Sequence, residues 1–399
     1  MQLVERHIRI DDKAVEAICF KSARLYNFCN YYMRQAVFGK VQKFKEYELT
    51  GLLTEFNQED YRELPAQTSQ QIIKLLFKNW KSYWESVKEY TKHPDRFFAK
   101  PRLPRYKKKD GYSICVFTAQ QVTQKEGFVH FPKQVELEPL KTKVDNICQV
   151  RVIPQANCFV IEVVYEKEKE VADVKKENVL SIDLGINNFV AAIDNVGQNP
   201  FIINGRKVKA INAYFNRKRA KLMSFIGNRG TSNRIEKLTL KRNNLIENFL
   251  HQSTAFIVKY CVEHKIGTVV IGKNENWKQK VNLGKRNNQN FVNIPYAKGI
   301  DKLRYKLELK GILLIEQEES HTSKCDHLAF ETIEHHKIYD GKRVKRGLFQ
   351  SSTGHYINSD VNGALGIGLK ANVFRNGKDF VLNLLDTGCA FQPVKLNVI

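Results

Sequence analysis

The chain has 399 residues, 42% hydrophobic and 27% charged, which is enough for two to three folded domains and excludes a disordered protein. Its formal net charge of +23 indicates a polyanionic partner, with nucleic acid the first to consider and a purely solubilising charge as the alternative. The chain lacks a long apolar run and the apolar core of a signal peptide, so we expect a cytoplasmic protein without membrane contact.

The first part of the chain is predicted to be a strand, a helical block and a small β-domain. Residues 1–10 alternate as a strand does, 11–110 are mainly helical, and 111–172 have the pattern of short strands in a small barrel or twisted sheet that the first strand joins. One helix has an apolar stripe formed by Ile73, Leu76, Phe77, Trp80, Trp84 and Val87. Helical spacing favours a core role for this stripe over a base-stacking platform.

A basic, proline-rich stretch ends the helical block. Seven of the fourteen residues from Arg96 to Lys109 are Lys or Arg, and aromatic residues lie between them. This mixture favours phosphate contact and base stacking, with a solvated linker as the alternative. The residues expected to contact nucleic acid are Lys100, Arg102, Arg105 and Lys107.

A charged, apolar-poor stretch at 166–178 predicts a domain boundary, after which the pattern changes. Three strands (VLSIDLG, FVAAID and PFIING) precede two long basic helices, where we expect Arg217 and Arg219 to contact nucleic acid. A buried strand GTVVIG, a helix after residue 296, a strand GILLIEQEE, a basic insertion and a final helix from about residue 361 follow. Three antiparallel strands followed by alternating strands and helices are typical of a ribonuclease-H-like fold.

Acidic residues follow or begin several of these elements. Asp183 lies inside an apolar strand, where a lone carboxylate is costly unless it is paired or binds metal, although it could also cap the strand end. Asp360 begins the last helix, where an N-cap role is the alternative. Glu318 and Glu319 end a strand, where they could simply be exposed. Cleavage of a phosphodiester by two Mg²⁺ or Mn²⁺ ions needs such carboxylates at one point, because these ions prefer oxygen ligands.

Several segments together resemble, in order and spacing, the TnpB (OrfB) family of insertion-sequence proteins. They include SIDLGINN, IENFLHQSTAFIV, TVVIGKNENWKQ, EESHTSKCD, GKRVKRGLF and INSDVNGALGI. The resemblance implies an RNA-guided DNA endonuclease in a bacterial cytoplasm, associated with the nucleoid. The implied multidomain α+β and α/β architecture is a wedge β-barrel (1–10 and 111–172), a helical recognition domain (11–110) and a RuvC-like nuclease domain (173–399). Its implied partners are a guide RNA from the end of the mobile element and double-stranded DNA with a short adjacent motif.

The chain departs from the family at its second catalytic carboxylate. That acid usually follows the strand that here reads TVVI, but this chain has Gly272 at the position. The segment EESHTS resembles the Glu-x-x-Thr-Ser of a relocated-glutamate branch shared with Fanzor relatives, and Glu318 and Glu275 are the next candidates. The predicted catalytic and metal-binding residues are therefore Asp183, Glu319 and Asp360.

Three other functions stay open at this point. If no acid replaces the missing one, the protein would be a guided repressor that binds DNA without cutting it. A transposase or its accessory protein would need strand-transfer chemistry, and no tyrosine nucleophile in a suitable context is present. An unguided junction resolvase would share the carboxylates but would not need large basic domains before the nuclease.

A second departure concerns a zinc ribbon that many relatives carry before the last aspartate, here about residues 322–357. Cys325 fills one of the four ligand positions, while Leu328, Gln350 and Thr353 fill the others, so we expect no zinc. The histidines of this insertion, expected to face solvent, are His327, His335, His336 and His355. Its basic residues, expected to hold a phosphate backbone near the active site, are Lys342, Arg343, Lys345 and Arg346.

Overall fold

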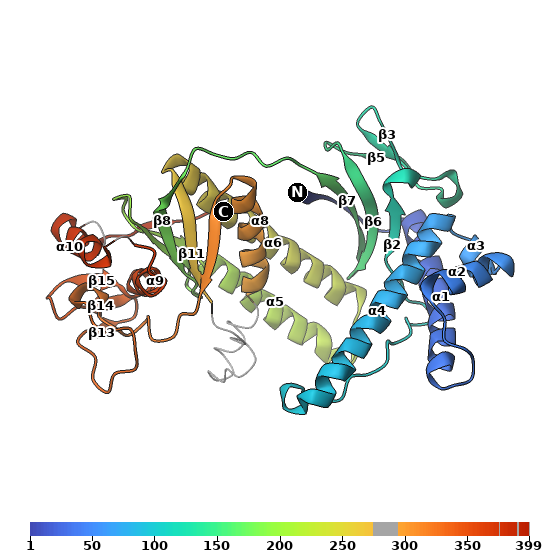
Figure 1. Cartoon of the computed structure of the whole chain (residues 1–399), viewed down its shortest axis with the longest axis horizontal. Helices are drawn as coiled ribbons and strands as arrows, with labels where there is room; N and C mark the ends of the chain where they lie inside the picture. Colours follow the sequence, from blue (N-terminus) through green and yellow to red (C-terminus); the bar gives the residue numbers. More distant parts are fainter. Residues whose placement is uncertain (274–293, 375, 389–390, 399) are drawn as a thin grey trace. The chain divides into compact units, whose positions relative to one another are not determined.

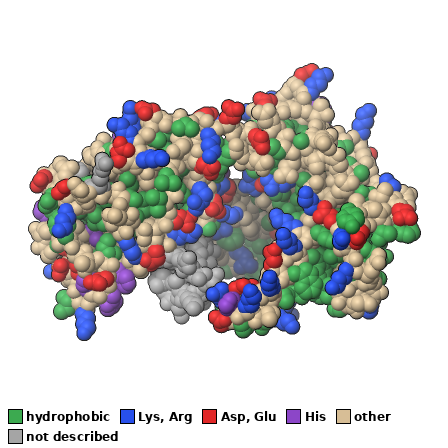
Figure 2. All heavy atoms as spheres, in the orientation of Figure 1, with side chains coloured by type: hydrophobic (Ala, Val, Ile, Leu, Met, Phe, Trp, Pro, Cys, Tyr) green, Lys and Arg blue, Asp and Glu red, His purple; other side chains and the backbone are tan. Residues whose placement is uncertain are grey.

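The structure is a computed structural model that describes residues 1–273, 294–374, 376–388 and 391–398. The chain folds as two compact units, Met1–Lys167 and Glu168–Ile399 (Figure 1). Among the described residues, no helix combines the length and apolar character needed to span a bilayer. Lys and Arg side chains lie among acidic ones over the face drawn in Figure 2.

The first unit contains four α-helices: α1 (Lys13–Val37), α2 (Glu46–Glu55), α3 (Glu59–Arg62) and α4 (Ala66–Lys92). Asp12 caps α1 by accepting a hydrogen bond from the Val15 amide at 3.1 Å. The predicted stripe of α4 is buried as far as Trp80, whose indole donates to Asn30 at 3.0 Å. Trp84 is 48% exposed, so its predicted core role is wrong, because α4 continues past the surface that its first half covers.

Seven strands complete the first unit. A four-stranded antiparallel sheet has the order β1 (Gln2–Arg9), β7 (Cys158–Glu166), β6 (Ile147–Gln155) and β2 (Cys115–Thr118). A three-stranded sheet consists of β3 (Thr123–Lys125), β4 (Phe128–His130) and β5 (Leu140–Lys141). The first strand joins the larger sheet, as predicted.

The larger sheet of the first unit stays open. Within residues 1–167, all of which are described, β1 and β2 are its two edges, and no hydrogen bonds close it into a barrel. Helices α1 and α4 pack on the strands, and Trp80 shares one apolar core with Phe117 and Ile161. Because the helices cover the apolar strand residues, the sheet buries its core without closing. Of the two predicted forms, a small barrel or a twisted sheet, the strand order fits the sheet.

The second unit contains a six-stranded mixed sheet. Its order is β12 (Leu313–Gln317), β11 (Ile266–Gly272), β8 (Lys175–Asp183), β9 (Asn188–Asp194), β10 (Phe201–Asn204) and β16 (Val394–Leu396). β9 is antiparallel to both β8 and β10, whereas β11 runs parallel to β8 and to β12. The first five of these strands follow one another along the chain as predicted. β16, which pairs parallel with β10, was not predicted.

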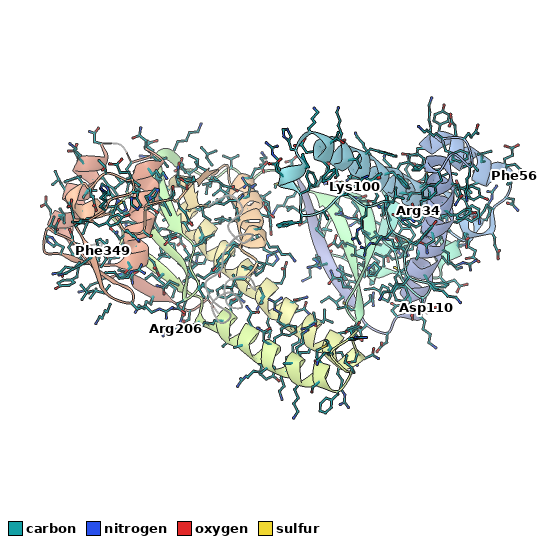
Figure 3. The ribbon with its side chains drawn as sticks, turned by 90° about the horizontal axis from the view of Figure 1, so that it is seen from below. Arg34, Phe56, Lys100, Asp110, Arg206 and Phe349 are labelled. Carbon is teal, nitrogen blue, oxygen red and sulfur yellow. The ribbon has the colours of Figure 1, made fainter. Side chains whose placement is uncertain are left out.

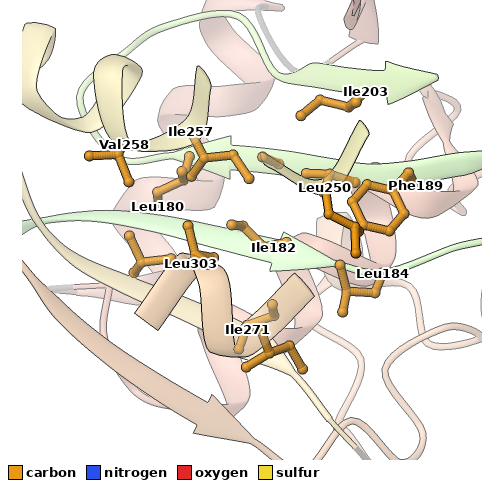
Figure 4. Packing of buried hydrophobic residues seen from close by; sticks show 14 of the residues in the cluster. Leu180, Ile182, Leu184, Phe189, Ile203, Leu250, Ile257, Val258, Ile271 and Leu303 are labelled. Atoms are coloured by element: carbon orange, nitrogen blue, oxygen red, sulfur yellow. The ribbon is translucent and has the colours of Figure 1, made fainter. Parts of the chain in front are cut away.

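Helices cover both faces of this sheet. α6 (Asn233–Glu263) and α8 (Tyr296–Leu309) pack on the face that carries Leu180 and Ile182 (Figure 4). α9 (Ser359–Lys370) and α10 (Gly377–Thr387) share the other core, which includes Val179. α5 (Arg206–Ser224) pairs with α6, and the strands β13 (Lys342–Lys345), β14 (Leu348–Gln350) and β15 (Tyr356–Asn358) form the insertion between β12 and α9. The predicted final helix therefore corresponds to α9, which α10 and β16 follow.

Candidate active site

Asp183 ends β8 on the side of the sheet that faces α9. Side chains alternate along a strand, so Asp183 shares the face of Val179 and Ser181, and the Ser181 hydroxyl donates to the Ala364 carbonyl of α9 at 2.6 Å. Gly363 brings the helix backbone close to this carboxylate. A Cβ atom at Gly363 would lie 3.0 Å from Oδ2 of Asp183, so a larger residue there would press on the carboxylate.

Glu319 lies beside Gly272. Gly272 pairs with Gln317 across the parallel strands β11 and β12, and the Lys273 amide donates to the Gln317 carbonyl at 2.8 Å. Two residues later, the Glu319 side chain turns onto Gly272. A Cβ atom at Gly272 would lie 2.5 Å from Oε2 of Glu319. The Glu319 carboxyl group therefore fills the space that a side chain at 272 would need.

Asp360 lies in the first turn of α9, but it does not cap the helix. Asn358 is the N-cap, because its side-chain oxygen accepts hydrogen bonds from the amides of Asp360 at 2.9 Å and Val361 at 3.4 Å. The Asn188 amide group donates to Oδ2 of Asp360 at 2.6 Å. The N-cap alternative is therefore wrong, and the Asp360 carboxylate is available for another role.

The charges of Glu319 and Asp360 both act on the carboxyl group of Asp183. Burial of its carboxyl group, followed by the charges of Glu319 and Asp360, raises the pKa of Asp183 from its ordinary 3.8 to about 8, although the whole residue is only half-buried. Burial, with a smaller contribution from Glu318, raises the pKa of Glu319 to about 7. A bound cation would offset the part of these pKa shifts that comes from repulsion between neighbouring carboxylates.

The donor set fits a hard divalent cation such as Mg²⁺, because it consists of carboxylate oxygens. Among the described residues, no three His, Cys, Asp or Glu side chains converge closely enough to hold one ion as they stand. Mutual repulsion between carboxylates favours such separation until a cation neutralises them. Metal binding would therefore need these side chains to move towards one another.

The two other glutamate candidates differ from Glu319. Glu318 is exposed, accepts a hydrogen bond from Nζ of Lys370 at 2.5 Å and bonds to Ser320. The bond to Lys370, followed by that to Ser320, lowers the pKa of Glu318 to about 2. This glutamate is thus already paired with a cation on α9. Glu275 lies outside the described residues.

The basic residues of the insertion are exposed on β13 or directly after it. Arg343 is near enough to Asp183 for its charge to lower the pKa of that carboxyl group. The remaining three, Lys342, Lys345 and Arg346, are also exposed. That these four residues hold a phosphate backbone stays a prediction.

Three of the four basic residues that we expect to contact nucleic acid are exposed on the proline-rich loop of the first unit. Lys100, labelled in Figure 3, is exposed, as are Arg102 and Arg105. Lys107 is half-buried, with Nζ 4.7 Å from the centre of the Tyr26 ring, and burial lowers its pKa. Its backbone bonds to Asn27, so Lys107 fastens the loop to α1, and its phosphate contact stays a prediction.

A groove that was not predicted from the sequence lies between α5 and α6. Arg217 and Arg219 are exposed, but they do not line it. Its lining includes Tyr214, Lys218, Lys221, Phe225, Arg234, Lys237 and Lys241. Tyr214 and Phe225 are 50% and 74% exposed. The α5 residues of this lining are three or four positions apart, which places them on one helical face. This spacing is the feature of the sequence that could have predicted the groove.

The predicted solvent exposure of the insertion's histidines is wrong for His327. It is only 1% exposed, and a Cβ atom at Gly366 of α9 would collide with its ring. His335 is exposed, whereas His336 and His355 are partly buried. Gly366 leaves space for the imidazole ring of His327. Because this glycine lies outside the insertion, the sequence of the insertion alone does not indicate that His327 is buried.

Two segments of the chain match models of known protein families. Residues 162–278 match the family model OrfB_IS605, a probable transposase, and residues 296–367 match the Cas12f1-like TNB domain. The TnpB-like protein ORF457 of Acidianus two-tailed virus is 23% identical over 397 residues, covering 88% of this chain and 81% of that protein. A solved Cas12f1–sgRNA–target DNA complex contains a chain of similar fold, with a TM-score of 0.53, 16% identity and coverage of 88% and 81%. These matches fit the TnpB (OrfB) family.

Proposed function

We propose that the protein is an RNA-guided DNA endonuclease that depends on divalent metal ions held by Asp183, Glu319 and Asp360. The observation that carries the proposal is the Glu319 carboxyl group beside Gly272. It puts an acid next to Asp183 at the sheet position where the family usually has one. The proposed catalytic unit is a RuvC-like domain with a relocated glutamate.

Each residue of the site has a distinct proposed task. Asn188 orients Asp360 through its hydrogen bond, and Arg343 neutralises the phosphate group that is cut. When bound, two Mg²⁺ or Mn²⁺ ions would polarise that phosphate and activate the attacking water. The Glu319 carboxylate supplies oxygen ligands that the glycine at 272 cannot.

The proposed partners are a guide RNA from the end of the mobile element and a matching DNA duplex with an adjacent motif. The likeness to a protein solved with guide RNA and target DNA supports them, as does the net charge of +23. A nuclease-inactive repressor would have no need to keep Glu319 packed on Gly272 beside Asp183. We therefore favour the nuclease over the repressor.

Guided cleavage is tested by co-expressing the protein with the DNA that flanks its gene. We expect an RNA to copurify and a duplex matching its guide to be cut in Mg²⁺ but not in EDTA. A duplex with a scrambled target is the control. RNA and target binding without cleavage would favour the repressor, and cleavage that ignores the guide sequence would favour the unguided resolvase.

The α5–α6 groove should contribute to RNA affinity. Its cations form no ion pair with any described residue, so they are available to phosphates (Lys218, Lys221, Arg234, Lys237 and Lys241). In the double variant Lys221→Ala and Lys237→Ala, we expect weaker RNA binding and a salt slope reduced by about 1.5, because each lost phosphate contact removes about 0.7–0.9. Fluorescence anisotropy across a salt series measures both.

Lys259→Ala is the matched control for the groove variant. Lys259 is an exposed cation of the same helix that pairs with Glu263 at 3.5 Å. Its loss should leave the salt slope unchanged. If the groove variant had the slope of the control, the groove would not be a phosphate contact.

A further inference from the structure

The insertion between β12 and α9 has two turns, at 325–328 and 350–353, where many relatives place zinc-binding cysteines. We propose that the buried carboxyl group of Asp326 joins these turns in place of a metal ion and makes Asp326 a positioning residue for Arg343. Phe349 of the same insertion is labelled in Figure 3. The part that concerns Arg343 rests on the proposed nuclease function, whereas the part that concerns the turns does not.

Three donors of the second turn bond to one oxygen of Asp326. Asp326 is fully buried, and its Oδ2 accepts hydrogen bonds from the Ser351 hydroxyl at 2.9 Å. It also accepts from the Ser352 amide at 2.7 Å and the Ser352 hydroxyl at 3.0 Å. Oδ1 of Asp326 is buried and bonds to no described residue, so the connection between the turns depends on Oδ2. Hydrogen bonds to a charged acceptor in a buried site are among the stronger ones.

The residues at the former ligand positions serve other purposes. Leu328 is fully buried in an apolar core with Phe349 and Ile357, where a zinc ion has no place. The Cys325 thiol donates to the His321 carbonyl at 3.1 Å, and burial raises its pKa. A zinc ligand must be a thiolate, so this environment disfavours metal binding.

Further contacts connect the two turns to the neighbouring chain and to α9. Glu331 accepts hydrogen bonds from the amides of Asp326 at 2.6 Å and Asp340 at 3.1 Å, which closes the loop between them. The Asn362 side chain of α9 donates to the Cys325 carbonyl at 2.9 Å. Asp326 thus belongs to a network that reaches the helix carrying Asp360. β14, which ends where the second turn begins, pairs with β13, where Arg343 lies opposite Phe349.

The connection between the turns is tested by hydrogen exchange at residues 342–358 of the purified full chain. We expect no stoichiometric zinc by elemental analysis and no loss of protection with a zinc chelator. Asp326→Asn should speed exchange of these amides by at least about tenfold, because the charged acceptor is lost. The double variant Ser351→Ala and Ser352→Gly should have a similar effect with the carboxylate intact, and it serves if Asp326→Asn fails to fold.

Asp340→Asn is the matched control, because Asp340 is an exposed acid of the same insertion whose side chain makes no bond to these turns. Stoichiometric zinc with chelator-sensitive protection would overturn the proposal. The proposal would also be overturned if the exchange rate in Asp326→Asn stayed within about twofold of the rate in Asp340→Asn. Such a change is too small for the loss of a buried hydrogen bond.

The positioning role is tested by a double-mutant cycle on cleavage rate in the RNA-loaded protein. Arg343→Ala and Asp326→Asn should each slow single-turnover cleavage without weakening target binding. Their combination should be no slower than Arg343→Ala alone, because both remove the same contact. Additive losses would show that Asp326 acts on cleavage by another route. An enzyme that does not cut at all would defeat the proposed function but leave the exchange result valid.

Discussion

Moving the acid from position 319 to position 272 should first abolish cleavage and then restore part of it. Glu319→Gly removes a proposed metal ligand, and we expect single-turnover cleavage to fall by at least about a thousandfold. Adding Gly272→Glu puts a carboxylate where the family usually has one. Because Glu319 no longer fills that space, only the end of the Ile367 side chain has to move. Cleavage should then recover to within about a hundredfold of wild type, the cost expected of a small misplacement.

Gly272→Glu alone is the control for the moved acid. Its Cβ atom would lie 2.5 Å from both Oε2 of Glu319 and Cδ1 of Ile367, so the single variant should lose thermal stability as well as activity. The double variant should be more stable than this single one. Equal damage in both variants, or full activity of Glu319→Gly, would contradict a shared position for the two side chains.

Asp183→Asn should raise the melting temperature of the metal-free protein by a few degrees at pH 8. The folded pKa of Asp183 is raised from 3.8 to about 8, so the folded state holds a proton that the unfolded state releases. This contribution to stability is present below pH 4 and is lost as the pH rises towards about 8. The asparagine does not ionise, so the variant escapes this loss.

Thermal unfolding in EDTA at several pH values measures the effect of Asp183→Asn. The advantage of the variant should shrink from pH 8 towards pH 4, and Mg²⁺ should stabilise the wild type more than the variant. Asp379→Asn, which changes an exposed acid of α10, is the control. A pH-independent difference, or equal stabilisation of both proteins by Mg²⁺, would argue against a cluster of carboxylates that binds metal.

The second unit could be predicted further than the first. Its strands are nearly continuous apolar runs with clear boundaries, and alternation alone puts Asp183 on one face of the sheet. The placement of Glu319 needed the family resemblance, because two acids end the same strand and periodicity does not say which one turns onto Gly272. Residue type also does not decide which residue caps α9, because both Asn358 and Asp360 are of types that favour the N-cap position.

Tertiary contacts explain what sequence reasoning missed. The stripe that contains Trp84 continues beyond the buried part of α4, and a hydrophobic period does not reveal where the covering surface ends. His327 is buried because Gly366, a distant glycine, leaves space for it. Lys107 fastens its loop through Tyr26, about eighty positions earlier, and β16 has only three residues. None of these contacts has a local signature.

The most direct measurement is single-turnover cleavage of a guide-matched duplex by the RNA-loaded wild type, Glu319→Gln and Glu318→Gln in Mg²⁺, with target binding measured in parallel. Each variant replaces one carboxylate by a neutral amide of the same size, and the two positions are adjacent. Glu319, however, lies against Gly272, whereas Glu318 pairs with Lys370. We predict that Glu319→Gln binds the target and does not cut it, while Glu318→Gln cuts within about threefold of wild type, as expected for an exposed side chain. Cleavage by Glu319→Gln at the wild-type rate would contradict the proposed site.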